Sequence, residues 1–277
     1  MAFLELPGGH RLWYEVVGEG PPLLLVPGLA GVSDFFAPHV RQLARRFRVV
    51  LHDHRGCGRS SLARIDYSIE QMAGDVVALM DHLGLERAHL LGHSTGGAIG
   101  QTLAIDRPER IDRLVLCATW TAADGWFRLL FQNRKEILEG LGPGAYARIS
   151  ALFLNAPFWV RLHPEIAAVS EEEARRRIRD PEILLRRIKA ILAFDRRADL
   201  PKIRAPTLVM GARDDMVTPA YFSEELGRLI PAAETVILPD GGHFFPVARE
   251  AVFRRHVLRF LGEPEELAAE NRARAGR

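Results

Sequence analysis

Short apolar runs alternate with amphipathic stretches along most of this 277-residue chain, and this alternation limits the possible folds more than any other feature. The apolar runs predict strands at 23–26, 48–53, 88–92, 114–118, 207–210 and 235–238. Helical spacing of apolar residues predicts helices at about 36–46, 69–83, 98–107, 220–229 and 248–261. Such an order is typical of a mostly parallel sheet covered by helices on both faces. Residues 12–17 are expected to form an antiparallel edge hairpin with 3–6.

The alternation stops between residues 119 and 205, where several helices and no clear strand are predicted. We therefore expect an α/β core of 1–118 and 206–262, an inserted helical segment of 119–205 and a charged tail of 263–277. Aromatic side chains are frequent in the inserted segment, where they either form its own core or line a pocket. The pocket candidates are Trp120, Phe127, Phe153 and Trp159, together with Phe244 near the end of the chain.

Composition excludes several classes of protein. Hydrophobic residues make up 48% and charged residues 26% of the chain, which is ordinary for a globular protein and argues against disorder. The net charge of +2 and the absence of a basic stripe argue against nucleic-acid binding. No signal-peptide pattern and no apolar run of the ~18 residues that a membrane span needs is present, so a cytoplasmic protein without membrane contact is expected. Cys57 and Cys117 fall in different predicted elements and are expected to be free thiols.

The sequence Gly-His-Ser-Thr-Gly at 92–96 follows a predicted strand and precedes a predicted helix. This is the setting of a nucleophile elbow, a sharp turn that exposes a serine at the edge of a sheet. Gly92 and Gly96 are expected because side chains there would collide with neighbouring backbone. Ser94 is therefore the candidate nucleophile.

A serine hydroxyl needs a general base, and chain order after such an elbow is serine, acid, histidine. His243 lies in a Gly-rich loop between the last strand and the last helix, and is the candidate base. Two adjacent carboxylates, Asp214 and Asp215, compete as the acid. Asp215 is favoured by its distance from the next helix, for which Thr218 is the expected N-cap and Pro219 the first residue.

Two backbone amides are needed to bind the oxyanion that forms on the substrate. The amide of Thr95 directly follows the nucleophile, and the amide of Leu29 lies in the Gly-rich loop after the first parallel strand. His52 and His54, with Cys57 nearby, have a spacing that a metal site could use, but no second ligand cluster accompanies them. Neither a dinucleotide fingerprint nor a Walker lysine is present, so no cofactor and no metal are expected.

These motifs together make the chain resemble the α/β-hydrolase superfamily from about residue 10 to residue 262. The resemblance is carried by five segments: Pro27–Leu29, Asp53–Ser60, Gly92–Gly97, the Asp215 loop and Gly242–His243. It implies an α/β-hydrolase fold with an eight-stranded, mostly parallel sheet and a helical lid at about 119–205. The oxyanion loop begins Pro-Gly where many relatives have His-Gly, which a backbone donor does not require.

Parts of the lid, 131–134 and 152–154 with Trp159, look like the hydrolase of the pyrimidine-utilisation pathway, assigned to aminoacrylate or carbamate cleavage. The acid loop and 118–120 are similar to 3-oxoadipate enol-lactonases and small bacterial carboxylesterases. From the triad candidates we predict a serine hydrolase, acting as monomer or homodimer. The aromatic content of the lid favours an apolar ester or lactone as its substrate. The alternatives are a small polar substrate such as a carbamate, a perhydrolase side activity and an inert ligand-binding protein. The polar substrate would use four lid residues: Arg128, Asn133, Arg134 and Asn155.

Overall fold

The strands of the chain form one eight-stranded sheet in the order β1-β2-β4-β3-β5-β6-β7-β8. The computed structural model describes residues 2–262, so the predicted tail at 263–277 lies outside the described residues. The strands are β1 Ala2–Leu6, β2 His10–Val17, β3 Pro22–Val26, β4 Arg48–His52, β5 Ala88–His93, β6 Ile111–Cys117, β7 Thr207–Ala212 and β8 Glu234–Leu238. All six strands predicted from apolar runs are present, with ends that differ by up to three residues.

The strands β3 to β8 run parallel, whereas β2 pairs antiparallel with both β1 and β4. The predicted edge hairpin is therefore present, with Leu6 opposite His10 across its turn. The predicted fold class, an α/β-hydrolase fold with an eight-stranded and mostly parallel sheet, is confirmed.

The parallel strands are mostly apolar because both faces of the sheet are covered. Successive side chains of a strand point to opposite faces. Along β3, Leu24 and Val26 accordingly pack into one hydrophobic core and Leu23 and Leu25 into the other.

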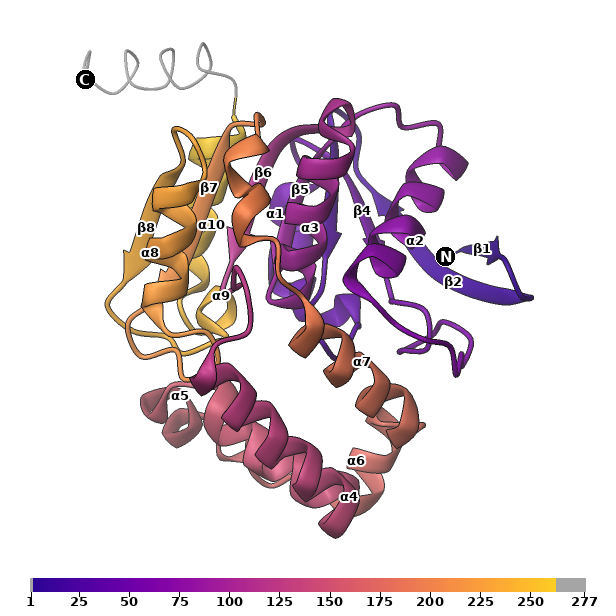
Figure 1. Ribbon diagram of the computed structural model, residues 1–277, viewed down its shortest axis with the longest axis vertical. Helices are drawn as coiled ribbons and strands as arrows, with labels where there is room; N and C mark the ends of the chain where they lie inside the picture. The colour runs from indigo at the N-terminus through magenta and orange to yellow at the C-terminus, as the bar shows by residue number, and fades with distance from the viewer. Residues whose placement is uncertain (1, 263–277) are drawn as a thin grey trace.

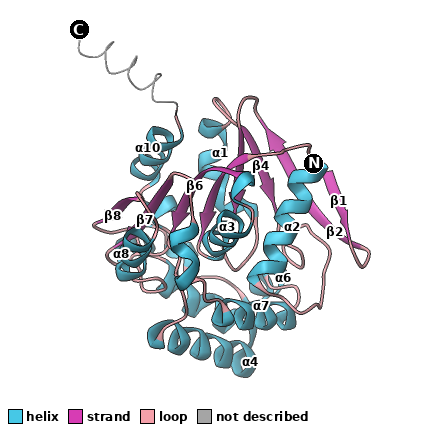
Figure 2. Ribbon diagram, turned by 45° about the horizontal axis from the view of Figure 1, so that its top comes forward, coloured by secondary structure: helices cyan, strands magenta, loops and turns pink. Residues whose placement is uncertain are grey.

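Helices cover the two faces of the sheet (Figure 2). The face of Leu24 carries α2 (Ile69–His82), α3 (Thr95–Asp106) and α8 (Ala220–Leu229). The face of Leu23 carries α1 (Ala37–Leu43), α9 (Phe245–Ala248) and α10 (Glu250–Leu261). The helix predicted at 248–261 is thus two helices, separated at Arg249, whose backbone leaves the helical region at φ −123° and ψ 41°.

The segment between β6 and β7 is helical, as predicted. It contains α4 (Gly125–Leu154), α5 (Pro157–Leu162), α6 (Glu171–Arg177) and α7 (Pro181–Ala193), and Figure 1 shows these helices gathered at one end of the molecule, beyond the sheet. Short 3₁₀ turns lie at Ser33–Phe36, Pro108–Arg110, Pro164–Ile166 and Arg197–Lys202.

The long helix α4 is broken near its middle. Gly142 has φ 80° and ψ −177°, and Pro143 follows it. Proline has no N–H for the helix ladder and disfavours helical backbone in the residue before it, so the break falls where these two residues meet. No helix within residues 2–262 has the length and apolar character that crossing a membrane requires.

Burial of uncharged histidine makes the stability of this fold sensitive to acid. His52 at the end of β4 is 1% exposed, and neither of its ring nitrogens has a hydrogen-bond partner among the described residues. Burial lowers the pKa of His52 from 6.5 to about 4. Below pH 6.5 the unfolded chain therefore binds a proton that the folded chain does not, and stability falls as the pH falls.

We predict that His52→Leu removes part of this acid sensitivity. Between pH 7.5 and pH 4 the wild type should lose about 3 kcal/mol more unfolding free energy than the variant. Urea denaturation at several pH values measures the difference. Parallel pH profiles for the two proteins would show that His52 is not held neutral by the fold.

Candidate active site

Ser94 lies at the turn between β5 and α3, and its backbone is strained. Its φ of 55° and ψ of −116° lie in a region that side chains other than glycine rarely adopt. A Cβ on Gly92 would lie 2.2 Å from the carbonyl oxygen of Gly96, and one on Gly96 would lie 2.0 Å from that of Val26. The expected reason for both glycines is confirmed, since the strand and helix approach too closely for side chains.

His243 follows β8 in a loop where Gly241 and Gly242 both have positive φ. Its Nδ1 lies 2.9 Å from Oδ2 and 3.1 Å from Oδ1 of Asp215, and both side chains are buried. Because Nδ1 faces a carboxylate, it carries the proton and donates it, which leaves Nε2 free to accept one. The structure thus brings Asp215 and His243 together, as the sequence predicted.

Asp215 is itself held in place by three donors. The amides of Val217 and Thr218 donate to its Oδ1 at 2.8 and 2.9 Å, and the hydroxyl of Thr218 donates to its Oδ2 at 2.8 Å. The predicted cap is wrong, because α8 begins at Ala220 with Pro219 in the N-cap position and no side-chain cap. Thr218 serves the carboxylate instead of the helix end.

Asp214 has a different environment. Its carboxylate accepts hydrogen bonds from the amides of Gly241 at 3.2 Å and Gly242 at 2.8 Å. It makes no contact with the ring of His243, but it ties down the loop that carries this ring. The two neighbouring aspartates therefore have separate tasks.

His93, the residue before the serine, is a support that the sequence analysis missed. Its ring stacks on Phe35 with centroids 4.2 Å apart, and its Nε2 donates to the carbonyl oxygen of His243 at 3.0 Å. Burial, and next the nearby His243, hold the pKa of His93 well below 6.5, so the ring is neutral. Only its place beside the serine in the pentapeptide could have indicated this role.

The predicted oxyanion donors are both free. Within residues 2–262 neither the amide of Leu29 nor that of Thr95 has a hydrogen-bond acceptor. Leu29 lies in a turn closed by a 3.0 Å bond from the amide of Gly31 to the carbonyl of Gly28. A Cβ on Gly28 would come within 3.2 Å of Cβ of Ser94, so this turn passes directly beside the serine.

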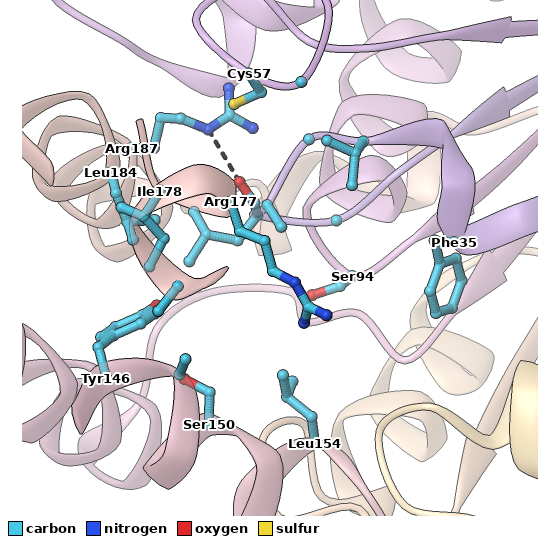
Figure 3. A pocket seen from close by; sticks show the side chains of 18 of the residues that line it. Phe35, Cys57, Ser94, Tyr146, Ser150, Leu154, Arg177, Ile178, Leu184 and Arg187 are labelled. Atoms are coloured by element: carbon cyan, nitrogen blue, oxygen red, sulfur yellow. Dashed lines mark hydrogen bonds between the residues drawn. The ribbon is translucent and has the colours of Figure 1, made fainter. Parts of the chain in front are cut away.

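Ser94 and His243 line one cavity of about 650 Å³ between the sheet edge and the inserted helices (Figure 3). In the described part of the chain no hydrogen bond joins their side chains. Such bonds between nucleophile and base are often long before a substrate is present, so their absence does not exclude catalysis.

The predicted pocket aromatics are mostly misplaced. Phe244 lines the cavity, but Trp120, Phe127, Phe153 and Trp159 do not. Trp120 and Phe127 are each 1% exposed and stack on one another at 4.7 Å, which makes them part of the hydrophobic core. Phe153 packs against that core, and Trp159 stacks on His163.

The cavity wall that the sequence analysis missed comes largely from α4 and α7. Its members include Phe131, Tyr146, Ser150, Leu154, Ile183, Leu184 and Arg187. The four-residue spacing of Tyr146, Ser150 and Leu154 places them on one helix face, and this spacing was the available signal. Of the four polar candidates, Arg134 and Asn155 are buried and line the cavity, whereas Arg128 and Asn133 are exposed.

The segment 52–57, whose histidine spacing could suit a metal site, makes structural contacts instead. Asp53 accepts bonds from Ser33 and Arg59, and Nε2 of His54 lies 3.1 Å from the carbonyl oxygen of Pro27. Within residues 2–262 no group of three potential ligands is close enough to hold a metal ion. Cys57 and Cys117 are free thiols.

A serine on a strained turn, a histidine–aspartate pair and two free amides around one cavity define the class of site found in hydrolases that attack carbonyl carbon. The family model described as alpha/beta hydrolase fold matches residues 21–248. The chain belongs to the α/β-hydrolase family and is a hydrolase.

Three individual proteins within this family are similar to the chain over most of its length. Two curated proteins called "Putative carbamate hydrolase RutD" are similar to this chain. The one from Azorhizobium caulinodans is 41% identical over 94% of this chain and 98% of that protein. The one from Caulobacter sp. is 39% identical over 90% of this chain and 95% of that protein. Among solved structures, the enol-lactonase from Burkholderia xenovorans LB400 is 30% identical, covers 95% of this chain and 100% of its own, and superposes with a TM-score of 0.86.

We predict that Asn in place of the two adjacent aspartates has unequal effects on ester or carbamate hydrolysis. Asp215→Asn should lower kcat by about 10³–10⁴-fold, because an amide cannot hold the His243 tautomer or its charged form. Asp214→Asn keeps one oxygen, which can still accept from the amide of Gly242, and loses the acceptor of the Gly241 amide. Because only this hydrogen bond outside the triad is lost, kcat should fall by about tenfold or less. Steady-state kinetics of both variants measure these effects. Equal losses of kcat in the two variants would contradict the assignment of Asp215 as the acid.

Proposed function

We propose that this chain is a cofactor-free serine hydrolase with Ser94 as nucleophile, His243 as base and Asp215 as the acid that orients it. The proposal rests on the Asp215–His243 pair, because His243 lines the same cavity as Ser94 on its strained turn. The two free amides of Leu29 and Thr95 support it.

In this mechanism Nε2 of His243 takes the proton of Ser94 as its Oγ attacks the carbonyl carbon of the substrate. The negative charge that develops on the carbonyl oxygen is held by the amides of Leu29 and Thr95. Asp215 stabilises the imidazolium that forms. His243 then gives its proton to the leaving group, and water activated by the same histidine releases the acyl or carbamoyl group from Ser94.

For the substrate, we propose a small polar compound of the carbamate type in preference to the apolar ester or lactone that the sequence suggested. Four of the five aromatic residues on which the apolar preference rested do not line the cavity, and two of them, Trp120 and Phe127, lie in the core. Two buried arginines, Arg134 and Arg187, line the cavity in their place. The names of the two curated relatives agree with this choice.

An ester or lactone is the second candidate. The enol-lactonase from Burkholderia xenovorans LB400 supports it, since its structure superposes over nearly the whole chain. The same triad would open a lactone through an acyl-enzyme, so the two candidates differ in the substrate and not in the protein chemistry.

We predict that methyl carbamate is hydrolysed with a kcat/KM equal to or above that for methyl acetate. The two compounds differ only in an amino group against a methyl group, and the ester is intrinsically more reactive. Methanol release measures both reactions, and Ser94→Ala should lower both by about 10⁴-fold or more.

Turnover of methyl acetate alone, abolished by Ser94→Ala, would favour the ester reading. Folded protein that hydrolyses neither compound, nor longer esters, would favour an inert binding protein. Turnover that survives Ser94→Ala would contradict the proposed nucleophile.

A further inference from the structure

Among residues 2–262 the guanidinium of Arg187 on α7 is a buried charge without an ion-pair partner. Its side chain is 0% exposed and lines the cavity. Its Nε donates to the carbonyl oxygen of Leu29 at 3.1 Å, but Nη1 and Nη2 have no hydrogen-bond partner among the described residues. Figure 3 shows Arg187 and Ser94 on the same cavity, with Cys57 beside the guanidinium.

The carboxylates around this cavity are already paired. Asp34 and Asp180 are the two that line it, and Asp75 lies close enough to feel the charge of Arg187. Their partners are Arg59 for Asp34 at 2.8 Å, Arg64 for Asp180 at 2.7 Å and Arg55 for Asp75 at 2.5 Å. Among residues 2–262, therefore, none of the carboxylates close to this cavity is left to pair with Arg187.

Three uncharged side chains also lie near the guanidinium. The ring of Tyr67 lies under it at 5.5 Å. Burial raises the pKa of Cys57, which keeps its thiol protonated. Burial, and next the charge of Arg187, hold the pKa of His54 well below 6.5. A buried, unpaired cation destabilises a fold, so its presence here points to a ligand that compensates it.

We propose that Arg187 binds a carboxylate of the substrate, separate from the carbonyl that is cleaved, and so selects anionic substrates. The planar fork of Nη1 and Nη2 matches the two oxygens of a carboxylate. This inference rests on the proposed serine hydrolase and names its substrate class more closely.

Arg187 also links the substrate anion to the chemistry. Its Nε holds the carbonyl of Leu29, and the amide of the same residue is one of the two proposed oxyanion donors. An anion on the terminal nitrogens fixes the guanidinium and, through Nε, the turn that carries this donor. Arg134 is the weaker candidate, because its Nη2 is already bonded to Tyr146 and Ser150.

The test compares two methyl esters that differ at the far end, monomethyl succinate with a carboxylate and methyl levulinate with a neutral acetyl group. The wild type should prefer the succinate ester in kcat/KM at pH 7.5. Arg187→Met should lower kcat/KM about 50-fold or more for the succinate ester, the loss expected for a charge-assisted pair. For the levulinate ester the loss should stay within about tenfold, the part due to the freed turn.

Controls separate this role from a structural one. Arg187→Met should keep or raise Tm, since it removes an unpaired buried charge. Arg186→Met removes a neighbouring charge on α7 that pairs with Glu182 outside the cavity, and should leave the preference between the esters unchanged. Arg187→Lys, which keeps the charge without the fork, should give an intermediate preference and serves if the Met variant does not fold.

Equal losses on both esters in a folded Arg187→Met protein would overturn the proposal, as would a wild type without preference for the anionic ester. A binding measurement is independent of turnover. Monomethyl succinate should bind Ser94→Ala at least about tenfold more tightly than Ser94→Ala/Arg187→Met by calorimetry, since the double variant lacks the charged donor. If this difference is present while no ester or carbamate is turned over, the anion site stands and the proposed hydrolase fails.

Discussion

The close approach of β5, α3 and β3 around Ser94 is the constraint on which the site depends. The strand ends, turns through one strained residue and continues directly as a helix, and this is possible because Gly92 and Gly96 leave no side chain between the backbones. The same turn leaves the amide of Thr95 without an acceptor and sets Ser94 beside Gly28 of the Leu29 loop. Strain at one residue is thus accepted by a fold whose sheet is covered on both faces, and Ser94 is placed on the cavity at the sheet edge.

His243 and its loop are held in place by contacts from several parts of the chain. Asp215 contacts its ring, Asp214 bonds to the two preceding glycine amides, and His93 donates to its carbonyl. Each support fixes a different part of the loop, so the imidazole is held in position before any substrate binds. Such preorganisation is where much of the rate enhancement of hydrolases arises.

The sequence predicted the features that local chemistry determines. Apolar runs predicted the parallel strands, and chain order with a Gly-rich loop predicted His243 and the pairing with Asp215. The predicted role of Thr218 was wrong. A threonine before proline can either cap a helix or bind a carboxylate, and the contact with Asp215 forms only in the tertiary structure. The predicted cavity wall was mostly wrong, because an aromatic side chain is equally suited to a hydrophobic core and to the wall of a pocket. Trp120 and Phe127 stack on one another in the core. The break at Gly142 and Pro143 in α4 and the placement of Arg187 depend on packing between distant helices.

Activation of Ser94 as a nucleophile by His243 and Asp215 is the step on which the proposed function depends. Its most direct test is the reaction of the folded protein with a small fluorophosphonate, followed by intact mass and peptide mapping. We expect one adduct, located on Ser94, that forms at least about 100-fold more slowly in Asp215→Asn. No adduct, or an adduct on another residue, would contradict this role of Ser94.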